Sequence, residues 1–579
     1  MPKKIRRRKF ELTDQLCLDH LHPVLQRIYQ ARDVKSENEL DHSLVRLPDP
    51  WLLTGMEAMV EELLTAIEKR KRIVVVADFD ADGATSCVVA KLGLELLGME
   101  AVEYVVPNRF KFGYGLTPEM VDVAMETQEK PPDILLTVDN GISSLEGVAA
   151  AKGKGLTVLV TDHHLPGDEL PAADAIVNPN LPNEAFPSKS LAGVGVMFYI
   201  LLALRTRMRE KGWFKDPNLP MPNLGQLLDL VALGTVADVV ALDQTNRVLV
   251  HQGLQRIKAG RSRPGLMALL AVAGREQHNL VAADLGFAIG PRLNAAGRLD
   301  DMSLGIECLL ADDDTIAKML ASKLDGLNKE RRELENQMKI EALDHLNRLQ
   351  KKDDAHLPMG VCIFEDSWHQ GIIGILAARI KDRTHRPVIA FAPSGEGEIK
   401  GSARSIAGVH IRDVLSEIAA THPRILSKFG GHAMAAGLSL KLSDYPAFSL
   451  AFDEVVRHHM AGVDLEQAVY TDGPLDDQQL LLEFAETLQS SGPWGQGFPE
   501  PCFDGEFDVL QCRIIGQKHL KFALRQIACS HMIDAVAFFV DEPESWLGCQ
   551  RIRTAYRLNV NEYRNNRSAQ LMIEYLERI

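Results

Sequence analysis

The chain has 579 residues, 46% of them hydrophobic, and a formal net charge of −15. Its length predicts three or more domains, and its negative charge excludes a surface coated with nucleic-acid-binding charge, so that a polyanion would need a local basic groove. No run of about 18 apolar residues and no Cys-x-x-Cys pair occurs, which predicts a cytoplasmic protein with reduced thiols and no membrane span.

Residues 1–55 are predicted to form an N-terminal extension. The extension begins with a basic arm, residues 3–9, which we interpret as a solubilising disordered tail in preference to a phosphate contact. A short helix is expected at residues 20–32.

The next segment is dominated by an apolar run that ends in three acids. Residues 73–76 are β-branched and uninterrupted, as in a strand buried on both faces of a parallel sheet. Asp78, Asp80 and Asp82 follow at alternating positions, before a helix expected at 84–97. Carboxylates so close together repel one another, and a bound Mg²⁺ or Mn²⁺ would remove that cost. For this segment alone, a solvated acidic turn remains the alternative.

The same pattern occurs twice more along the chain. A strand expected at 134–138 runs into Asp139, and a strand expected at 156–161 runs into Asp-His-His at 162–164. Ligands bind at the carboxyl ends of strands in open α/β sheets, so these ends together predict one metal site rich in oxygen ligands, with one or two imidazoles. Zinc sites built on cysteine are excluded because these motifs contain none.

Strand and helix patterns alternate from about residue 56 to 310, which predicts a domain with a parallel sheet. A helix is expected at 57–71 and a further strand at 102–106. The loop that follows combines cations, aromatic residues and glycines, and it could stack a base and hold a phosphate or be an ordinary turn. Its candidate residues are Arg109, Phe110, Phe112 and Tyr114.

Later stretches of this domain carry further candidates. Residues 191–196 lack the third glycine of a dinucleotide-binding fingerprint, so that interpretation is rejected. Asp238 lies in an apolar helix-like run where a carboxylate needs a partner; we take it as a metal ligand, with an N-cap or salt bridge as the alternative. Arg292 and Arg298 flank Asn294 in a polar stretch suited to phosphate oxygens, or to interdomain salt bridges.

Residues 312–352 have apolar side chains at helical spacing and many charges, which predicts a long helix between domains. A second α/β domain should follow, with strands at 361–364 and 388–391 and a helix opening near Trp368. Turns of small residues at 401–405 and 429–433 would let backbone N–H groups approach an anion. Their candidate residues are Ser402, Arg404, Gly431 and His432.

The last segment contains short β patterns separated by turns, which predicts a sandwich or a barrel, with an OB-type barrel among the candidates. Strands are expected at 507–510, 513–515, 521–524, 535–539 and 554–560. Arginines between Arg551 and Arg567 would give it a basic face, which could meet solvent, DNA or an acidic partner.

With these motifs the chain resembles the DHH phosphoesterase superfamily, and most closely its branch of bacterial single-strand-specific 5′-to-3′ exonucleases. The resemblance runs from about residue 56 to the C terminus. It rests on the stretches 78–83, 138–141, 162–164, 234–238, 290–298, 402–405 and 430–432, in the family's order.

The resemblance implies an α/β fold: a parallel-sheet DHH catalytic domain, a long linker helix, a smaller DHHA1 domain and an OB-like β-barrel. The expected divisions are 1–55, 56–310, 311–355, 356–460 and 461–579. It also implies a monomer that uses one or two Mn²⁺ or Mg²⁺ ions to remove 5′ nucleotides from single-stranded DNA in recombination and mismatch repair. The implied partners are the single-stranded-DNA-binding protein and a RecQ-type helicase.

A hypothesis for the residues follows from the motifs and the resemblance together. The expected metal ligands are Asp78, Asp80, Asp82, Asp139, His163 and Asp238. His164 would contact the scissile phosphate, aided by Arg292, Asn294 or Arg298, among which the sequence does not choose. The terminal 5′-phosphate would be held by Ser402 and Arg404, with Arg109, Gly431 and His432. Bases would stack on Phe110, Phe112, Tyr114 or Trp368.

The sequence leaves two rival functions open. An enzyme of the same superfamily that cuts short oligonucleotides, cyclic dinucleotides or pyrophosphate would share the metal site, although the chain's length and its β module favour a polymer substrate. A non-catalytic single-strand-binding scaffold predicts lost metal ligands, whereas every candidate ligand is present.

Overall fold

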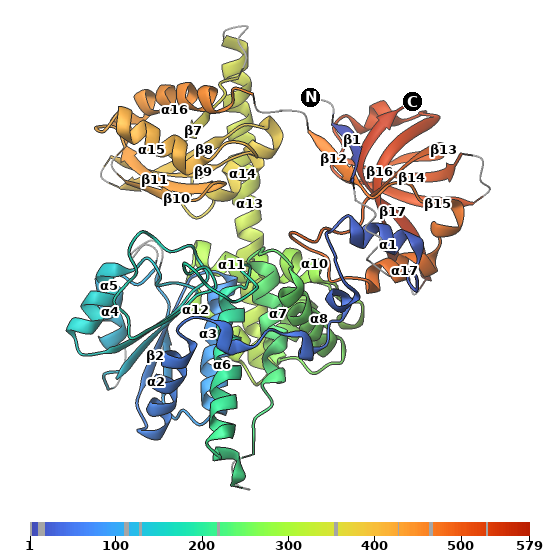
Figure 1. Ribbon diagram of the computed structural model, residues 1–579. Helices are drawn as coiled ribbons and strands as arrows, with labels where there is room; N and C mark the ends of the chain where they lie inside the picture. The colour runs from blue at the N-terminus through green and yellow to red at the C-terminus, as the bar shows by residue number, and fades with distance from the viewer. Residues whose placement is uncertain are drawn as a thin grey trace. The chain divides into compact units, whose positions relative to one another are not determined.

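The computed structural model of the chain forms two compact units (Figure 1). The first comprises Met1–Gly297, Asp301–Asp325 and Gln467–Ile579, and the second Arg298–Asp300 and Gly326–Glu466. The structure describes residues 3–9, 18–108, 115–126, 130–216, 220–352, 357–395, 397–426, 428–462, 467–527, 531–564 and 566–579. Within these ranges no helix is long and apolar enough to cross a membrane.

The first unit contains the predicted parallel sheet. Its five strands, in spatial order, are β3 (Val102–Val105), β2 (Ile73–Ala77), β4 (Ile134–Val138), β5 (Thr157–Thr161) and β6 (Ala175–Val177). All four pairings are parallel, so the strands end at one edge of the sheet. Every residue of β2 and β4 is buried, as expected for β-branched and leucine-rich runs covered on both faces.

Helices cover the sheet and extend the unit. The helices α4 (Pro118–Glu126) and α5 (Leu145–Gly153) pack on the face that carries Val74 and Val76. The helices α2 (Met56–Glu68), α3 (Ala81–Leu96) and α6 (Gly193–Glu210) contact one another and the strands of the same sheet. Helix α3 begins three residues earlier than predicted, because the Asp80 side chain caps it and accepts from the N–H groups of Asp82 and Gly83.

A helical region follows the sheet in the same unit. Its elements are α7 (Leu228–Ala237), α8 (Gln244–Lys258), α9 (Pro264–Val272), α10 (Ala282–Asp284), the π-helical turn η7 (Leu285–Ile289), α11 (Gly290–Leu299) and α12 (Ser303–Leu310). The stretch 290–298, expected between helices, is itself helix α11. The predicted long helix is α13 (Asp314–Lys352), and it contributes to both units.

The second unit has a mixed five-stranded sheet. Its strands, in spatial order, are β10 (Lys428–Gly431), β11 (Ala435–Lys441), β9 (Glu398–Arg404), β8 (Val388–Gly395) and β7 (Val361–Phe364). Its helices are α14 (Ile373–Thr384), α15 (Ile411–Thr421) and α16 (Tyr445–His459). The prediction of a turn at 401–405 was wrong: Ser402 and Arg404 lie on strand β9, where the space beside Gly401 is taken by the Phe391 ring.

The C-terminal part of the first unit is a closed five-stranded barrel, as predicted. In spatial order its strands are β13 (Phe503–Ile515), β14 (His519–Gln526), β15 (Met532–Ala537), β17 (Asn566–Arg578) and β16 (Arg551–Tyr563). Two predicted short strands form the single strand β13, and β17 was not predicted. Strand β12 (Ala468–Thr471) and helix α17 (Leu482–Ser490) precede the barrel.

The N-terminal arm belongs to this C-terminal module, so the prediction of a disordered tail was wrong. Strand β1 (Lys4–Arg7) pairs in parallel with β12. Arg7 forms an ion pair with Asp504 at 2.8 Å, and Arg8 with Asp472 at 3.3 Å. No Lys or Arg occurs between Arg457 and Arg513, the segment that contains both acids. Their ion-pair partners therefore come from the arm, which is distant in sequence. Helix α1 (Pro23–Gln30) continues the contact, since the Tyr29 and Trp494 rings stack at 6.0 Å.

Candidate metal centre

Carboxylates and imidazoles converge at the edge where β2, β4 and β5 end. Each of three groups has ligand atoms that all lie within 4.8 Å of one another. The groups are Asp78, Asp80 and Asp139; Asp82, His163 and Asp238; and Asp139, His163 and His164. The structure therefore brings together every residue that the sequence suggested as a metal ligand, and the groups overlap at Asp139 and His163.

Asp139 and His163 provide the direct test of whether these residues fit a cation. His163 Nε2 lies 3.1 Å from Asp139 Oδ1. Both atoms are buried, and neither has a hydrogen-bond partner among the residues that the structure describes. Burying two polar atoms without hydrogen-bond partners costs free energy, unless another group binds to them. A divalent cation that accepts one oxygen and one imidazole nitrogen fits that need.

Asp82 is held in place by a feature that the sequence did not suggest. Its carboxylate accepts the backbone N–H groups of Gly193 at 2.7 Å and of Val194 at 3.0 Å, at the start of helix α6. A Cβ at position 193 would lie 2.7 Å from the Asp139 Cβ, so only glycine fits between the two acids. The glycine-containing stretch rejected as a dinucleotide motif thus supports the acidic cluster, and a helix N-terminus stabilises negative charge there.

The first residue of the Asp-His-His run orients the others. Asp162 Oδ1 lies 2.7 Å from His164 Nδ1 and accepts the backbone N–H of His163 at 2.7 Å. Its Oδ2 accepts the Ile142 N–H at 2.9 Å. With its oxygens committed in this way, Asp162 positions the two histidines rather than joining the groups that could hold a metal.

Burial and mutual repulsion shift the pKa values across the cluster. Burial, followed by the charge of Asp80, raises the pKa of Asp82 to about 7. Burial and the charge of Asp82 raise the pKa values of Asp139 and Asp238 well above the usual range. Burial and the neighbouring His164 lower the pKa of His163 to about 4. Burial opposes charge on His164, but its hydrogen bond to Asp162 raises the pKa to about 9.

The raised pKa of Asp82 predicts that divalent-cation binding depends on pH. Because the bare site retains protons that a cation must displace, affinity for Mn²⁺ should fall as pH drops from 8 to 6, by roughly tenfold per unit below the pKa for each proton displaced. Calorimetric titration at several pH values, in buffers of different ionisation enthalpy, measures both the affinity and the released protons. A pH-independent affinity without proton release would contradict the prediction.

Residues of the stretch 290–298 hold neighbouring segments in place more than they contact the candidate metal site. Arg292 pairs with Asp325, with Nη2 2.8 Å from Oδ1, and its Nη1 donates to the Ala288 carbonyl at 2.6 Å. Since this guanidinium is buried and engaged, the structure does not support its predicted contact with the scissile phosphate. The Asn294 amide oxygen accepts the Ala81 N–H at 2.8 Å, which fixes the acidic loop.

The second unit contains the two residues, Ser402 and Arg404, that the sequence suggested for holding an anion. Ser402 and Arg404 lie two residues apart on β9, and Arg404 Nη1 donates to Ser402 Oγ at 3.2 Å. A Cβ at Gly374 would lie 3.0 Å from both Ser402 Oγ and Arg404 Nη2, so the first turn of α14 faces this pair. Burial lowers the pKa of Arg404, and no carboxylate of the described ranges forms an ion pair with it. A half-buried guanidinium beside a helix N-terminus suits a phosphate.

The other residues that were predicted to contact DNA differ in how far their surroundings support that role. Arg298 Nη1 donates to the Gly371 carbonyl at 3.1 Å, within the second unit. Trp368 is only 4% exposed and donates its indole N–H to Glu341, so the structure does not support base stacking on it. Gly431 ends β10, and the His432 N–H donates to the Ala435 carbonyl. The predicted contacts of Arg109, Phe110, Phe112 and Tyr114 lie outside the described residues.

Models of protein families match three parts of the chain. Residues 72–235 match the N-terminal domain of the DHH family, residues 357–458 the DHHA1 domain and residues 471–575 the RecJ OB domain. The first match contains β2, β4, β5 and every candidate ligand of the metal centre except Asp238, and the second contains Ser402 and Arg404.

Whole-chain relatives agree with these matches. The single-stranded-DNA-specific exonuclease RecJ of Dickeya dadantii is 52% identical over 96% of this chain and 96% of its own length. The crystal structure of RecJ from Thermus thermophilus in complex with Mn²⁺ is 29% identical, with a TM-score of 0.78 over 97% of this chain and 76% of that one. The Mg²⁺ complex of the same protein, at 28% identity, has a TM-score of 0.73 over 97% and 75%.

Proposed function

Because the chain belongs to the RecJ family of single-stranded-DNA-specific exonucleases, we propose that its metal centre removes nucleotides one at a time from the 5′ end of a single strand. The chain is a metal-dependent single-stranded-DNA exonuclease with Mn²⁺ or Mg²⁺ as cofactor. The observation that carries the assignment is the pair of unsatisfied atoms, Asp139 Oδ1 and His163 Nε2, among four further carboxylates.

We propose a role for each residue of the centre, either in holding the metal ions or in contacting the substrate. One or two divalent ions would be held by Asp78, Asp80, Asp82, Asp139, His163 and Asp238, and Asp139 belongs to two of the overlapping groups. Bound there, such ions supply Lewis-acid activation of water and neutralise charge on the phosphate oxygens. His164, kept protonated by Asp162, would donate to the scissile phosphate and stabilise its growing negative charge. Arg298 remains the candidate for a second cationic contact.

Polarity requires a site that recognises the terminal phosphate. We assign this role to Ser402 and Arg404 with the N–H groups that begin α14, and Gly431 and His432 would complete the pocket. A strand anchored by its 5′-phosphate presents the same bond to the metal centre in every cycle. That arrangement would release one nucleotide for each cut.

Replacing Arg404 by Ala should therefore change end selectivity more than metal binding. The variant loses the charge-assisted contact to the terminal phosphate, so we expect its preference for 5′-phosphorylated over 5′-hydroxyl strands to fall by about tenfold or more. Cleavage of matched strands with each end measures the ratio, and Mn²⁺ titration provides the control. An unchanged ratio would reject this assignment of the pocket.

The function itself is tested by digestion of single strands labelled at the 5′ or the 3′ end, beside the matching blunt duplex. Reactions would contain Mn²⁺, Mg²⁺ or chelator, and Asp139→Ala would serve as the inactive control. Labelled mononucleotide released early from the 5′-labelled single strand alone supports the proposal. Inert long strands with turnover of dinucleotides would instead support a small-substrate phosphodiesterase.

The cellular setting is proposed on the same family membership. We expect a cytoplasmic monomer that acts in recombination and mismatch repair, beside the single-stranded-DNA-binding protein and a RecQ-type helicase. The proposed domains remain residues 56–310, the linker 311–355, 356–460 and 461–579. Of the extension 1–55, the basic arm and α1 would function as part of the last of these.

A further inference from the structure

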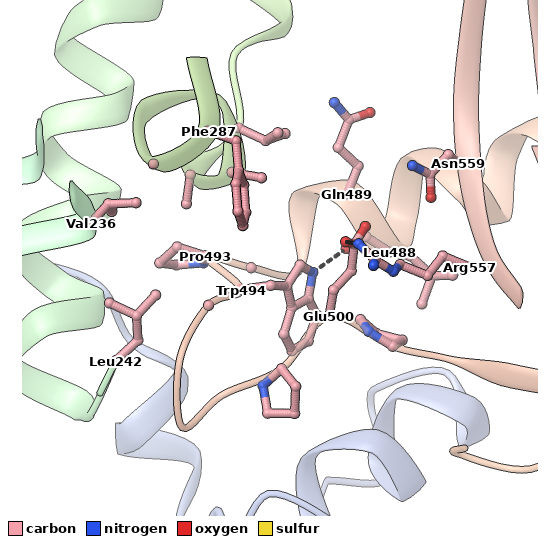
Figure 2. Close-up of a pocket in the computed structure, with 18 of the residues that line it drawn as sticks. Val236, Leu242, Phe287, Leu488, Gln489, Pro493, Trp494, Glu500, Arg557 and Asn559 are labelled. Carbon is pink, nitrogen blue, oxygen red and sulfur yellow. Dashed lines mark hydrogen bonds and ion pairs between the residues drawn. The ribbon is translucent and has the colours of Figure 1, made fainter. Parts of the chain in front are cut away.

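Within the first unit, the helical region and the barrel module face each other across a cavity of about 700 Å³ (Figure 2). Phe287 of η7 lines one side of it, and Gln489 of α17 lines the other. Gln489 also contacts the loop between α9 and α10, because its Nε2 donates to the Asn279 carbonyl oxygen at 3.4 Å. This loop, residues 273–281, is therefore one of the places where the helical region contacts the barrel module.

Three side chains that could ligate a metal ion meet at this contact. Glu276 and His278 come from the loop, and Glu562 comes from the end of β16. One ligand atom of each residue lies within 4.8 Å of the other two. Glu562 Oε2 is held there by the Asn279 side-chain amide, which donates to it at 2.6 Å across 283 positions of the chain. The fold thus assembles the group, since no short motif contains all three residues.

The two glutamates have no lysine or arginine partner, unlike the acids around them. Six acids of the barrel module each form an ion pair with an arginine: Glu486, Glu500, Glu506, Asp508, Glu574 and Glu577. Arg567 lies opposite Glu562 in the β16–β17 pairing, but it pairs with Glu486 instead. Among the described residues, the ion-pair partner of Glu276 is His278 alone, at 3.3 Å, and Glu562 has none. Two carboxylates held this close with so little compensation favour a bound cation.

The ligand types and their spacing indicate the kind of ion. Mg²⁺ and Ca²⁺ prefer oxygen ligands, whereas Zn²⁺ binds both imidazole nitrogen and carboxylate oxygen. Ligand atoms around one tetrahedral Zn²⁺ lie about 3.4 Å apart. Glu276 Oε2 and His278 Nε2 already lie 3.3 Å apart, and their side chains are 66% and 67% exposed, so small rotations can bring the group around one ion. A water molecule can fill the fourth position.

We propose that Glu276, His278 and Glu562 bind a divalent transition-metal ion of the Zn²⁺ class, at a site that shares no residue with the candidate metal centre. The ion joins the loop 273–281 to β16 and so fastens the barrel module to the helical region beside the cavity. The inference does not depend on the proposed exonuclease function, because its three ligands belong to none of the groups assigned to the reaction.

The test measures amide hydrogen exchange of the full-length chain with and without Zn²⁺, peptide by peptide. At free Zn²⁺ about tenfold above its dissociation constant, exchange should slow by about tenfold in peptides that contain His278 or Glu562, because opening the contact then requires the ion to leave. Peptides that contain Asp139 report Zn²⁺ at the candidate metal centre and serve as an internal reference. Unchanged exchange around both His278 and Glu562 would overturn the proposal.

Two substitutions separate the ion from the contact itself. His278→Ala removes the imidazole, and Glu562→Gln removes a charge but keeps an oxygen for the Asn279 N–H. Each should leave exchange without Zn²⁺ unchanged and raise the Zn²⁺ concentration for half-protection by about tenfold or more. The matched control is His20→Ala, because His20 Nε2 lies 3.5 Å from Glu37 Oε1 but belongs to no three-ligand group of the described residues. Protection that persists in His278→Ala, or that His20→Ala also removes, would show that Zn²⁺ does not bind through this group.

Discussion

Replacing Asp139 by Asn should abolish nuclease activity while leaving the fold intact. Asp139 has a φ of +61°, a conformation that Asn adopts more easily than most residues, and Asn keeps the shape that Gly193 accommodates. The change removes the carboxylate shared by the overlapping ligand groups. Since the ions supply several kcal/mol of transition-state stabilisation, we expect the rate on single-stranded DNA to fall by about a thousandfold or more.

The same substitution should stabilise the metal-free protein. Burial and neighbouring acids raise the pKa of Asp139 in the folded state, so above that pKa its charge opposes folding. Without added metal at pH 8, Asp139→Asn should therefore melt at a higher temperature than the unaltered chain. It should also lose most of the increase in melting temperature that Mn²⁺ gives the unaltered chain. Thermal unfolding with and without Mn²⁺ measures both effects.

Asp162→Asn is the matched control, because Asp162 is an equally buried acid at the end of the adjacent strand. Burial opposes its charge, but hydrogen bonds from His164 and from the Ile142 backbone hold its pKa below the usual value. That charge stabilises the fold above the unfolded pKa, so the control should lower the metal-free melting temperature. If both substitutions shifted stability in the same direction, the electrostatic account of the centre would be wrong.

The convergence of the candidate metal ligands was predictable from the sequence, because a parallel sheet brings the carboxyl ends of its strands to one edge. Three apolar runs ending in Asp or His predicted one site, and β2, β4 and β5 place them together. Ser402 and Arg404 were also predicted to act together, and they are hydrogen-bonded to each other, although a strand and not a turn carries them. In each case the chemistry was local to a short motif.

The support of the site was not predictable, because it comes from contacts between segments far apart in the chain. Nothing in a glycine-containing run indicates that its N–H groups hold Asp82, 111 residues away. The sequence also did not indicate that the Arg292 guanidinium, which looked suited to a phosphate, forms an ion pair with Asp325 instead. The basic arm was interpreted as a tail because its charge-balancing acids lie more than 460 residues further along the chain.

Those distant contacts predict a large effect for a residue that does not touch the metal centre. Asp472 pairs with Arg32, with Oδ1 2.9 Å from Nη1 and Oδ2 3.1 Å from Nη2. Both side chains are at most 1% exposed. Asp472→Ala leaves the Arg32 charge buried without its partner, which should destabilise the barrel module by about 3–5 kcal/mol. In chains whose other four tryptophans are replaced by Phe, denaturant unfolding followed by Trp494 fluorescence would measure the loss, since Arg32 lies 5.3 Å from that ring.

The matched control is Asp508→Ala on β13, which breaks exposed ion pairs with Arg551 and Arg525 and should change stability little. A double substitution, Arg32→Met with Asp472→Leu, separates the cost of an unpaired charge from the loss of the pair. It should recover much of the stability lost in Asp472→Ala, since apolar groups of similar volume can replace a buried pair. Dinucleotide cleavage should survive in all three variants at temperatures where the β2–β4–β5 edge stays folded. Equal destabilisation by Asp472→Ala and Asp508→Ala would contradict the predicted cost of leaving the buried Arg32 charge without its partner.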